Sequence, residues 1–156
     1  MRFSSPPDRS SMTHRDRITC SATMDNLAAL MAFADRACAA AGLDSDETFA
    51  VRLSIEEICA NVINHGYAKQ KAGERPITVD FISCAEEVVT TIEDRGITFD
   101  PATAPAPMLT GDAMQRTVGG IGLHLVRSLM DEVRHEPAPG GGNRLTLVKR
   151  RVPATT

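Results

Sequence analysis

The chain has 156 residues, 42% of them apolar, no tryptophan and a formal net charge of −3, so it is long enough for one domain with a substantial core. This charge balance gives neither a basic nucleic-acid footprint nor a polybasic membrane patch, and we expect no nucleic acid and no membrane among its partners. No apolar run approaches the ~18 residues of a membrane span, and the first 13 residues contain no hydrophobic signal core.

The four cysteines are scattered and form no Cys-x-x-Cys pair. They are Cys20, Cys38, Cys59 and Cys84. Each lies among apolar or small residues, which favours buried, reduced thiols over a disulfide or a metal role. We therefore expect a cytoplasmic protein.

Helical and strand patterns alternate along the chain, which indicates the α/β class. Residues 1–13 are rich in Ser, Pro and Arg and are expected to form a disordered leader, followed by one domain at 14–151 and a tail at 152–156. The pattern predicts a strand at 17–23, helices at 24–41 and 44–67, strands at 77–84 and 87–93, a helix ending near 130, and a hairpin of strands at 133–136 and 144–150. We assign the hairpin no chemistry.

The second helix has a clear start and a clear buried face. Asp44 precedes it, and Glu47 follows three residues later in capping-box spacing. Apolar residues with spacing 4, 3, 4 mark the side that faces the core: Val51, Ile55, Ile58 and Val62.

Beside this apolar stripe runs a polar one, formed by Glu57, Asn61, Asn64 and His65 at positions i, i+4, i+7 and i+8. These residues share about a third of the helix circumference. Polar groups beside a core face need partners, because an unpaired buried polar group costs roughly 1–3 kcal/mol. A magnesium-bound nucleotide would be such a partner, and a row of surface polar residues is the alternative.

A second motif, Asp94-Arg95-Gly96, follows the strand at 87–93. A carboxylate at a strand end can accept a hydrogen bond from a docked group such as the exocyclic amine of adenine, and Gly96 would let the base or sugar approach the backbone. An ordinary turn is the alternative, because Asp and Gly are common turn formers.

A long segment without periodicity, 102–118, precedes the last helix, and segments of this kind are often lids. It ends in a glycine-rich sequence made of Thr117, Val118, Gly119, Gly120, Ile121 and Gly122. Glycines followed by a helix N-terminus suit a phosphate group, because backbone N–H groups and the helix dipole attract an anion. A tight loop packed under the helix is the alternative.

Taken in order, these three motifs resemble the Bergerat-fold (GHKL) ATP-binding superfamily. The likeness is greater to its small stand-alone branch, the bacterial anti-sigma-factor serine/threonine kinases that phosphorylate anti-anti-sigma proteins. It is carried by E-I-C-A-N followed by N-H-G-Y, by D-R-G-I-T-F-D-P, and by G-G-I-G-L-H-L-V-R-S-L-M-D-E-V, and it covers residues 17–150. The resemblance implies a two-layer α+β sandwich, with an antiparallel or mixed sheet and helices on one face.

The resemblance also implies roles for the polar stripe. Asn61 would be the ligand of Mg²⁺, and Glu57 would be the general base. His65 would reach the nucleotide or brace the end of the helix, and we favour bracing. Asn64 is grouped with them as a nucleotide-binding residue.

The other two motifs would hold the remaining parts of ATP. Asp94 would bind adenine, and Gly96 would line its pocket. The phosphates would lie against the backbone of the glycine-rich sequence, at Gly119, Gly120, Ile121 and Gly122. Arg116 and Thr117 would lie near the γ-phosphate.

The chain departs from the superfamily pattern in one motif, because Thr98 stands where many members have a second glycine. The expected function is an ATP- and Mg²⁺-dependent serine/threonine protein kinase. Its partners would be an anti-anti-sigma-type substrate and a sigma factor, and it could form a homodimer. The alternatives are a nucleotide-dependent protein-binding regulator with little or no kinase activity, and an interaction scaffold that no longer binds nucleotide.

Overall fold

The computed structural model describes residues 12–68, 70, 73–98 and 121–152. In these ranges five strands form one antiparallel sheet in the order β1-β2-β3-β5-β4. The strands are β1 (Met12–Ser21), β2 (Pro76–Cys84), β3 (Glu87–Asp94), β4 (Glu132–Pro137) and β5 (Asn143–Arg150).

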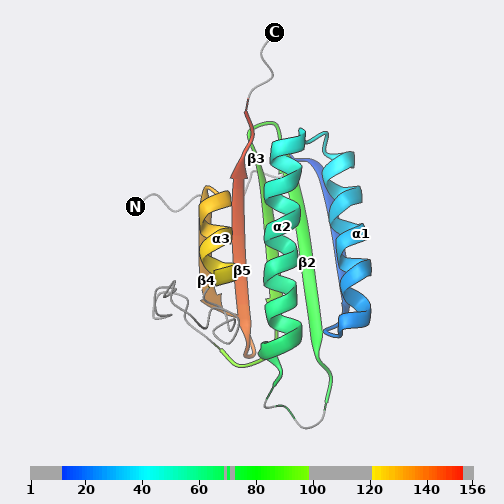
Figure 1. Cartoon of the computed structure of the whole chain (residues 1–156), viewed down its shortest axis with the longest axis vertical. Coiled ribbons are helices and arrows are strands. Elements are labelled where there is room, and N and C mark those ends of the chain that lie inside the picture. Colours follow the sequence, from blue (N-terminus) through cyan, green and yellow to red (C-terminus); the bar gives the residue numbers. More distant parts are fainter. Residues whose placement is uncertain (1–11, 69, 71–72, 99–120, 153–156) are drawn as a thin grey trace.

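Three helices cover one face of this sheet (Figure 1): α1 (Met24–Ala40), α2 (Ser45–Asn61) and α3 (Ile121–Leu129). A five-residue π-helix, η2 (Val62–Gly66), continues α2. Helix α2 packs against both α1 and α3. The expected α+β sandwich with helices on one face is confirmed, and every strand pair in the sheet is antiparallel.

The start of α2 is fixed by the expected capping box. The Glu47 N–H donates to Asp44 Oδ1 at 2.7 Å, and the Asp44 N–H donates to Glu47 Oε1 at 3.0 Å. Glu47 Oε2 also accepts a hydrogen bond from the Val152 N–H at 3.0 Å, and the Arg151 guanidinium donates to the Gly42 carbonyl at 3.2 Å. The Glu47 carboxylate therefore stabilises the start of α2 and also binds the backbone of Val152, which follows β5.

The hydrophobic core lies between the helices and the sheet. The predicted core stripe is buried along its whole length, from Val51 on α2 to Val62 on η2. Side chains alternate between the two faces of a strand, and on β3 the buried set ends with Ile92 and Asp94. This alternation places the Asp94 carboxylate on the helix side of the sheet, at the end of the strand.

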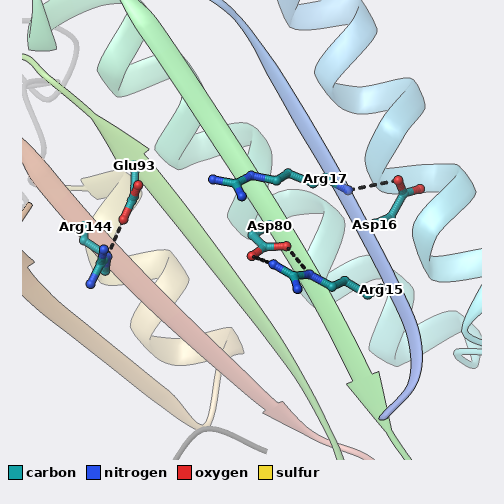
Figure 2. Close-up of polar contacts among 6 residues, drawn as sticks. All are labelled: Arg15, Asp16, Arg17, Asp80, Glu93 and Arg144. Carbon is teal, nitrogen blue, oxygen red and sulfur yellow. Dashed lines mark hydrogen bonds and ion pairs between the residues drawn. The ribbon is translucent and has the colours of Figure 1, made fainter. Parts of the chain in front are cut away.

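The opposite face of the sheet carries cross-strand ion pairs (Figure 2). Arg15 pairs with Asp80 at 3.1 Å, and Arg144 pairs with Glu93. Each pair joins neighbouring strands and is partly exposed, so each adds at most about 1 kcal/mol to stability.

The largest difference from the expected boundaries is at the first strand. Strand β1 begins at Met12 rather than at residue 17, and Met12 pairs with Cys84, so the strand includes the last residues assigned to the leader. The pattern failed here because residues 15–17 are all charged and conceal the alternation of β1, which among the described strands pairs only with β2. The rest of the leader and the long segment 102–118 lie outside the described residues.

All four cysteines are free. Cys38, Cys59 and Cys84 are buried as expected, whereas Cys20 is only half-buried. Burial raises the pKa of Cys38 to about 11 and that of Cys59 to about 12, so both remain thiols at neutral pH. In the part of the chain that the structure describes, no helix is both long and apolar enough to span a bilayer.

Candidate functional site

A cavity of about 270 Å³ lies where the end of α2 meets the ends of β3 and β5. Its walls are mainly apolar, with a few polar groups among them. The lining residues are Ile58, Asn61, Val62, His65, Gly66, Ile92, Asp94, Ile97, Leu123, His135, Asn143 and Leu145. An apolar cavity with a few convergent polar groups is typical of a small-molecule site.

The predicted polar stripe of α2 divides at this cavity. Asn61 and His65 line it, whereas Asn64 is exposed and Glu57 is half-buried outside the lining. For Asn64 this has a geometric cause, because η2 begins directly after Asn61. A π-helix closes its hydrogen bonds over five residues rather than four, so each residue past Asn61 turns through a smaller angle than in an α-helix. His65 stays in line with Asn61, while Asn64 rotates away.

Asp94 is the charged group of the cavity, and only 6% of its surface is exposed. Its Oδ1 accepts hydrogen bonds from the Gly96 N–H at 2.8 Å and from Asn143 Nδ2 at 3.2 Å. Among the described residues no donor reaches its Oδ2. Burial raises the pKa of Asp94, and the two hydrogen bonds and nearby His135 partly offset that rise.

Gly96 has a steric role that the sequence did not reveal. A Cβ at this position would lie 2.1 Å from the Gly66 carbonyl oxygen, so the turn after β3 lies too close to the end of η2 for any side chain at residue 96. The Ile97 N–H donates to that same oxygen at 3.0 Å. Gly96 itself is not among the lining residues, and it acts by letting this turn dock beside the cavity.

Tyr67, which directly follows η2, contacts the same turn from a second side. Its hydroxyl donates to the Pro76 carbonyl and accepts a hydrogen bond from the Arg95 N–H at 2.8 Å. The side chain is 3% exposed, and burial raises its pKa. Tyr67 is the last residue of the N-H-G-Y motif, but the motif indicated no role for its hydroxyl.

The β4–β5 hairpin, to which we assigned no chemistry, contributes His135, Asn143 and Leu145 to the cavity. Asn143 is the first residue of β5 and lies directly opposite Asp94 in the ladder. Starting the strand at residue 144 concealed this position. Including Asn143 in the alternation with Leu145 and Leu147 would have placed a polar side chain on the core face.

The predicted phosphate segment is described only from its end. Arg116, Thr117, Gly119 and Gly120 lie outside the described residues, while Ile121 and Gly122 open helix α3. Leu123, in the first turn of α3, lines the cavity. The N-terminal end of this helix therefore lies beside the cavity, where its dipole favours an anion.

Among the described residues there is no group of three or more His, Cys, Asp or Glu side chains placed to hold a metal ion. Asn61, the expected ligand of Mg²⁺, lines the cavity with a neutral amide. An amide oxygen is an acceptable ligand for Mg²⁺, which usually takes one or two protein oxygens and completes its shell with phosphates and waters.

Comparison with known proteins gives a match to the family model of the histidine kinase-like ATPase domain over residues 20–149. The chain is 33% identical over 97 residues to the serine-protein kinase RsbW of Bacillus subtilis (strain 168), a match that covers 60% of this chain and 59% of that protein. It is 29% identical over 98 residues to the RsbW of Listeria monocytogenes serovar 1/2a, with coverage of 60% and 61%. The match thus spans about three fifths of the length of these curated relatives.

A solved structure has a similar fold. The structure of the RsbU and RsbW domains of Rv1364c from Mycobacterium tuberculosis superposes with a TM-score of 0.63 at 23% identity. The superposition covers 91% of this chain and 34% of that one. At this level of identity the similarity concerns the arrangement of the helices and the sheet.

Proposed function

The chain belongs to the histidine kinase-like ATPase (GHKL) domain family, and on that basis we propose that it is an ATP- and Mg²⁺-dependent serine/threonine protein kinase. It phosphorylates a partner of the anti-anti-sigma type and sequesters a sigma factor, and so regulates transcription. The relatives named as serine-protein kinases support the choice of acceptor.

The observation that carries the proposal is the buried carboxylate of Asp94 beside an apolar cavity. Its Oδ1 has two donors, whereas its Oδ2 has none among the described residues, so this oxygen can accept the exocyclic amine of adenine. The cavity, at about 270 Å³, is just under the ~300 Å³ at which pockets for drug-sized ligands begin, so it suits a purine base rather than a whole nucleotide.

The sugar and phosphates of ATP would extend from this cavity past Asn61 toward the start of α3. Asn61 would contribute an oxygen to Mg²⁺, and the bound ion would neutralise phosphate charge. The backbone at Gly119, Gly120, Ile121 and Gly122 would hold the phosphates, with Thr117 nearby. His65 would line the adenine pocket or brace the helix end, and Asn64, which faces solvent, would reach the nucleotide only from outside the cavity.

Glu57 would be the general base for the acceptor hydroxyl. It lies one α-helical turn before Asn61, outside the cavity lining and half-buried. A base that acts at the γ-phosphate belongs at the phosphate end of the site, so this location is compatible with the role. Glu57 lies outside the cavity, however, and if it does not reach the acceptor hydroxyl, the second candidate function is favoured. That function is a nucleotide-dependent protein-binding regulator with little or no kinase activity.

Calorimetric titration with ATP, with and without Mg²⁺, tests the nucleotide site. We expect magnesium-dependent binding to the wild type and at least a tenfold loss in Asn61→Ala. A matched control is Asn26→Ala, because Asn26 lies on α1 and, within the described ranges, its amide donates to the Ser21 carbonyl and does not line the cavity. Absence of ATP binding by the wild type in both conditions would refute the kinase proposal.

A further inference from the structure

Asn143 has only one possible amide orientation in this site. Its Nδ2 lies between two acceptors, Asp94 Oδ1 at 3.2 Å and the Ile97 carbonyl at 2.8 Å. Its Oδ1 lies 2.7 Å from His135 Nε2. Because both neighbours of Nδ2 can only accept, the amide must face them with its NH₂ group, and His135 must donate from Nε2.

This orientation makes a chain of donors that runs from β4 through β5 to β3. His135 donates to Asn143, and Asn143 donates to Asp94, each step joining adjacent strands of the sheet. The chain ends on Oδ1, the same oxygen that accepts from the Gly96 N–H. Two donors on one oxygen fix the carboxylate plane and leave Oδ2 as the oxygen available to a ligand.

We propose that Asn143, oriented by His135, is a positioning residue that makes Asp94 select a 6-amino purine over a 6-oxo purine. This inference rests on the proposed function, in which Asp94 meets the 6-position of the base. Neither hairpin residue needs to touch the nucleotide for the effect, because both act through the carboxylate.

The selectivity follows from hydrogen-bond chemistry. The 6-amino group of adenine is a donor and pairs with Oδ2, whereas the 6-oxo group of hypoxanthine is an acceptor and would face a second acceptor in a buried site. A site built for one hydrogen bond rejects an analogue that lacks it, because its own polar group is left unpaired. The N–H donors on Oδ1 favour the ionised carboxylate, which can only accept. Without Asn143, Asp94 would bind a proton more readily and could then donate to a 6-oxo group.

The test compares ATP with ITP, in which a 6-oxo group replaces the 6-amino group of ATP. The affinities of both are measured by calorimetry with Mg²⁺ for the wild type, Asn143→Leu, His135→Phe and His135→Gln. We expect the wild type to prefer ATP at least tenfold, and Asn143→Leu to narrow that ratio by about tenfold. His135→Phe should reduce the ATP-to-ITP affinity ratio by a smaller factor. His135→Gln, which retains a hydrogen-bond donor, should keep the ratio near the wild-type value.

Glu136→Gln is the matched control, because Glu136 is the exposed neighbour of His135 on β4 and pairs with Arg144 on the other face of the sheet. It should leave the ATP-to-ITP ratio unchanged. Thermal unfolding of each variant, monitored by circular dichroism, checks that it is folded.

The outcomes separate this inference from the proposed function. If the wild type binds neither nucleotide, the proposed function fails and this inference fails with it. If the wild type prefers ATP and Asn143→Leu keeps the full preference, or loses both nucleotides equally, only the positioning role is refuted. If Asn143→Leu does not fold, His135→Phe decides, and an unchanged ratio in that variant overturns the inference.

Discussion

Replacing Gly96 with alanine tests whether the turn after β3 must dock on the end of η2. In the native structure the new Cβ would lie 2.1 Å from the Gly66 carbonyl oxygen and 2.6 Å from its carbon. Both distances are far inside contact range, and both atoms belong to the backbone, so no side-chain rotation can relieve the clash. The turn must move away from η2 by roughly an ångström.

The size of the effect follows from what this movement breaks. The turn would lose the hydrogen bond from the Ile97 N–H to the Gly66 carbonyl and weaken the one from the Arg95 N–H to Tyr67. Each is worth about 1 kcal/mol net, and overpacking of a buried contact costs about 1–3 kcal/mol. We expect Gly96→Ala to lower the free energy of unfolding by about 2–4 kcal/mol.

Urea denaturation of Gly96→Ala and of a matched variant, Gly66→Ala, measures this directly. A Cβ at Gly66 would meet only Val62 at 3.4 Å, an ordinary contact, so Gly66→Ala should change stability by less than about 1 kcal/mol. Both variants add the same methyl group and restrict the unfolded chain equally. The difference between their free energies of unfolding therefore measures the cost of the clash at residue 96. Equal stabilities for the two variants would refute the docking argument.

Three further predictions concern the carboxylates of Asp94 and Glu57. Asp94→Asn should abolish ATP binding in calorimetry, because an amide that keeps its oxygen toward Asn143 places an NH₂ group where the base amine also donates. Burial raises the pKa of Asp94 in the folded state above its ordinary 3.8. As pH rises, the unfolded chain therefore loses this proton at a lower pH than the folded protein does. The free energy of unfolding of the wild type consequently falls as pH rises from about 3.8 through the raised pKa. Urea denaturation should therefore find Asp94→Asn at least as stable as the wild type at pH 7, with the difference shrinking below pH 4; a less stable variant at pH 7 would contradict the burial argument. Glu57→Ala should keep ATP affinity but lose transfer of the γ-phosphate to a partner, and transfer at the wild-type rate in a radiolabel assay would exclude Glu57 as the general base.

The elements that could be predicted from the sequence are those with a local physical signal. The capping box at Asp44 and Glu47 depends on residues three apart, and the stripe from Val51 to Val62 depends on the α-helical repeat, so both were recognisable without tertiary information. The place of Asp94 at the end of β3 followed in the same way from strand alternation.

The parts that could not be predicted depend on contacts between distant residues. The change from α-helix to π-helix at Val62 has no marker in the local pattern, and it moves Asn64 out of the cavity. The pairing of Asp94 with Asn143 depends on strand register between segments 49 residues apart. Register is set by the whole sheet, so the hairpin contribution to the site emerged only from the structure.

The attachment of Val152 to Glu47 has a practical consequence for how this protein is immobilised or labelled. Strand β5 runs from Asn143 at the cavity to Arg150, seven steps of about 3.4 Å, so its far end lies roughly 24 Å from the cavity. In Figure 1 this end lies at the top, opposite the end of α2 that borders the cavity. An affinity handle or fluorophore placed beyond Val152 would therefore leave the cavity mouth unobstructed, and surface-based binding assays should be built on that end.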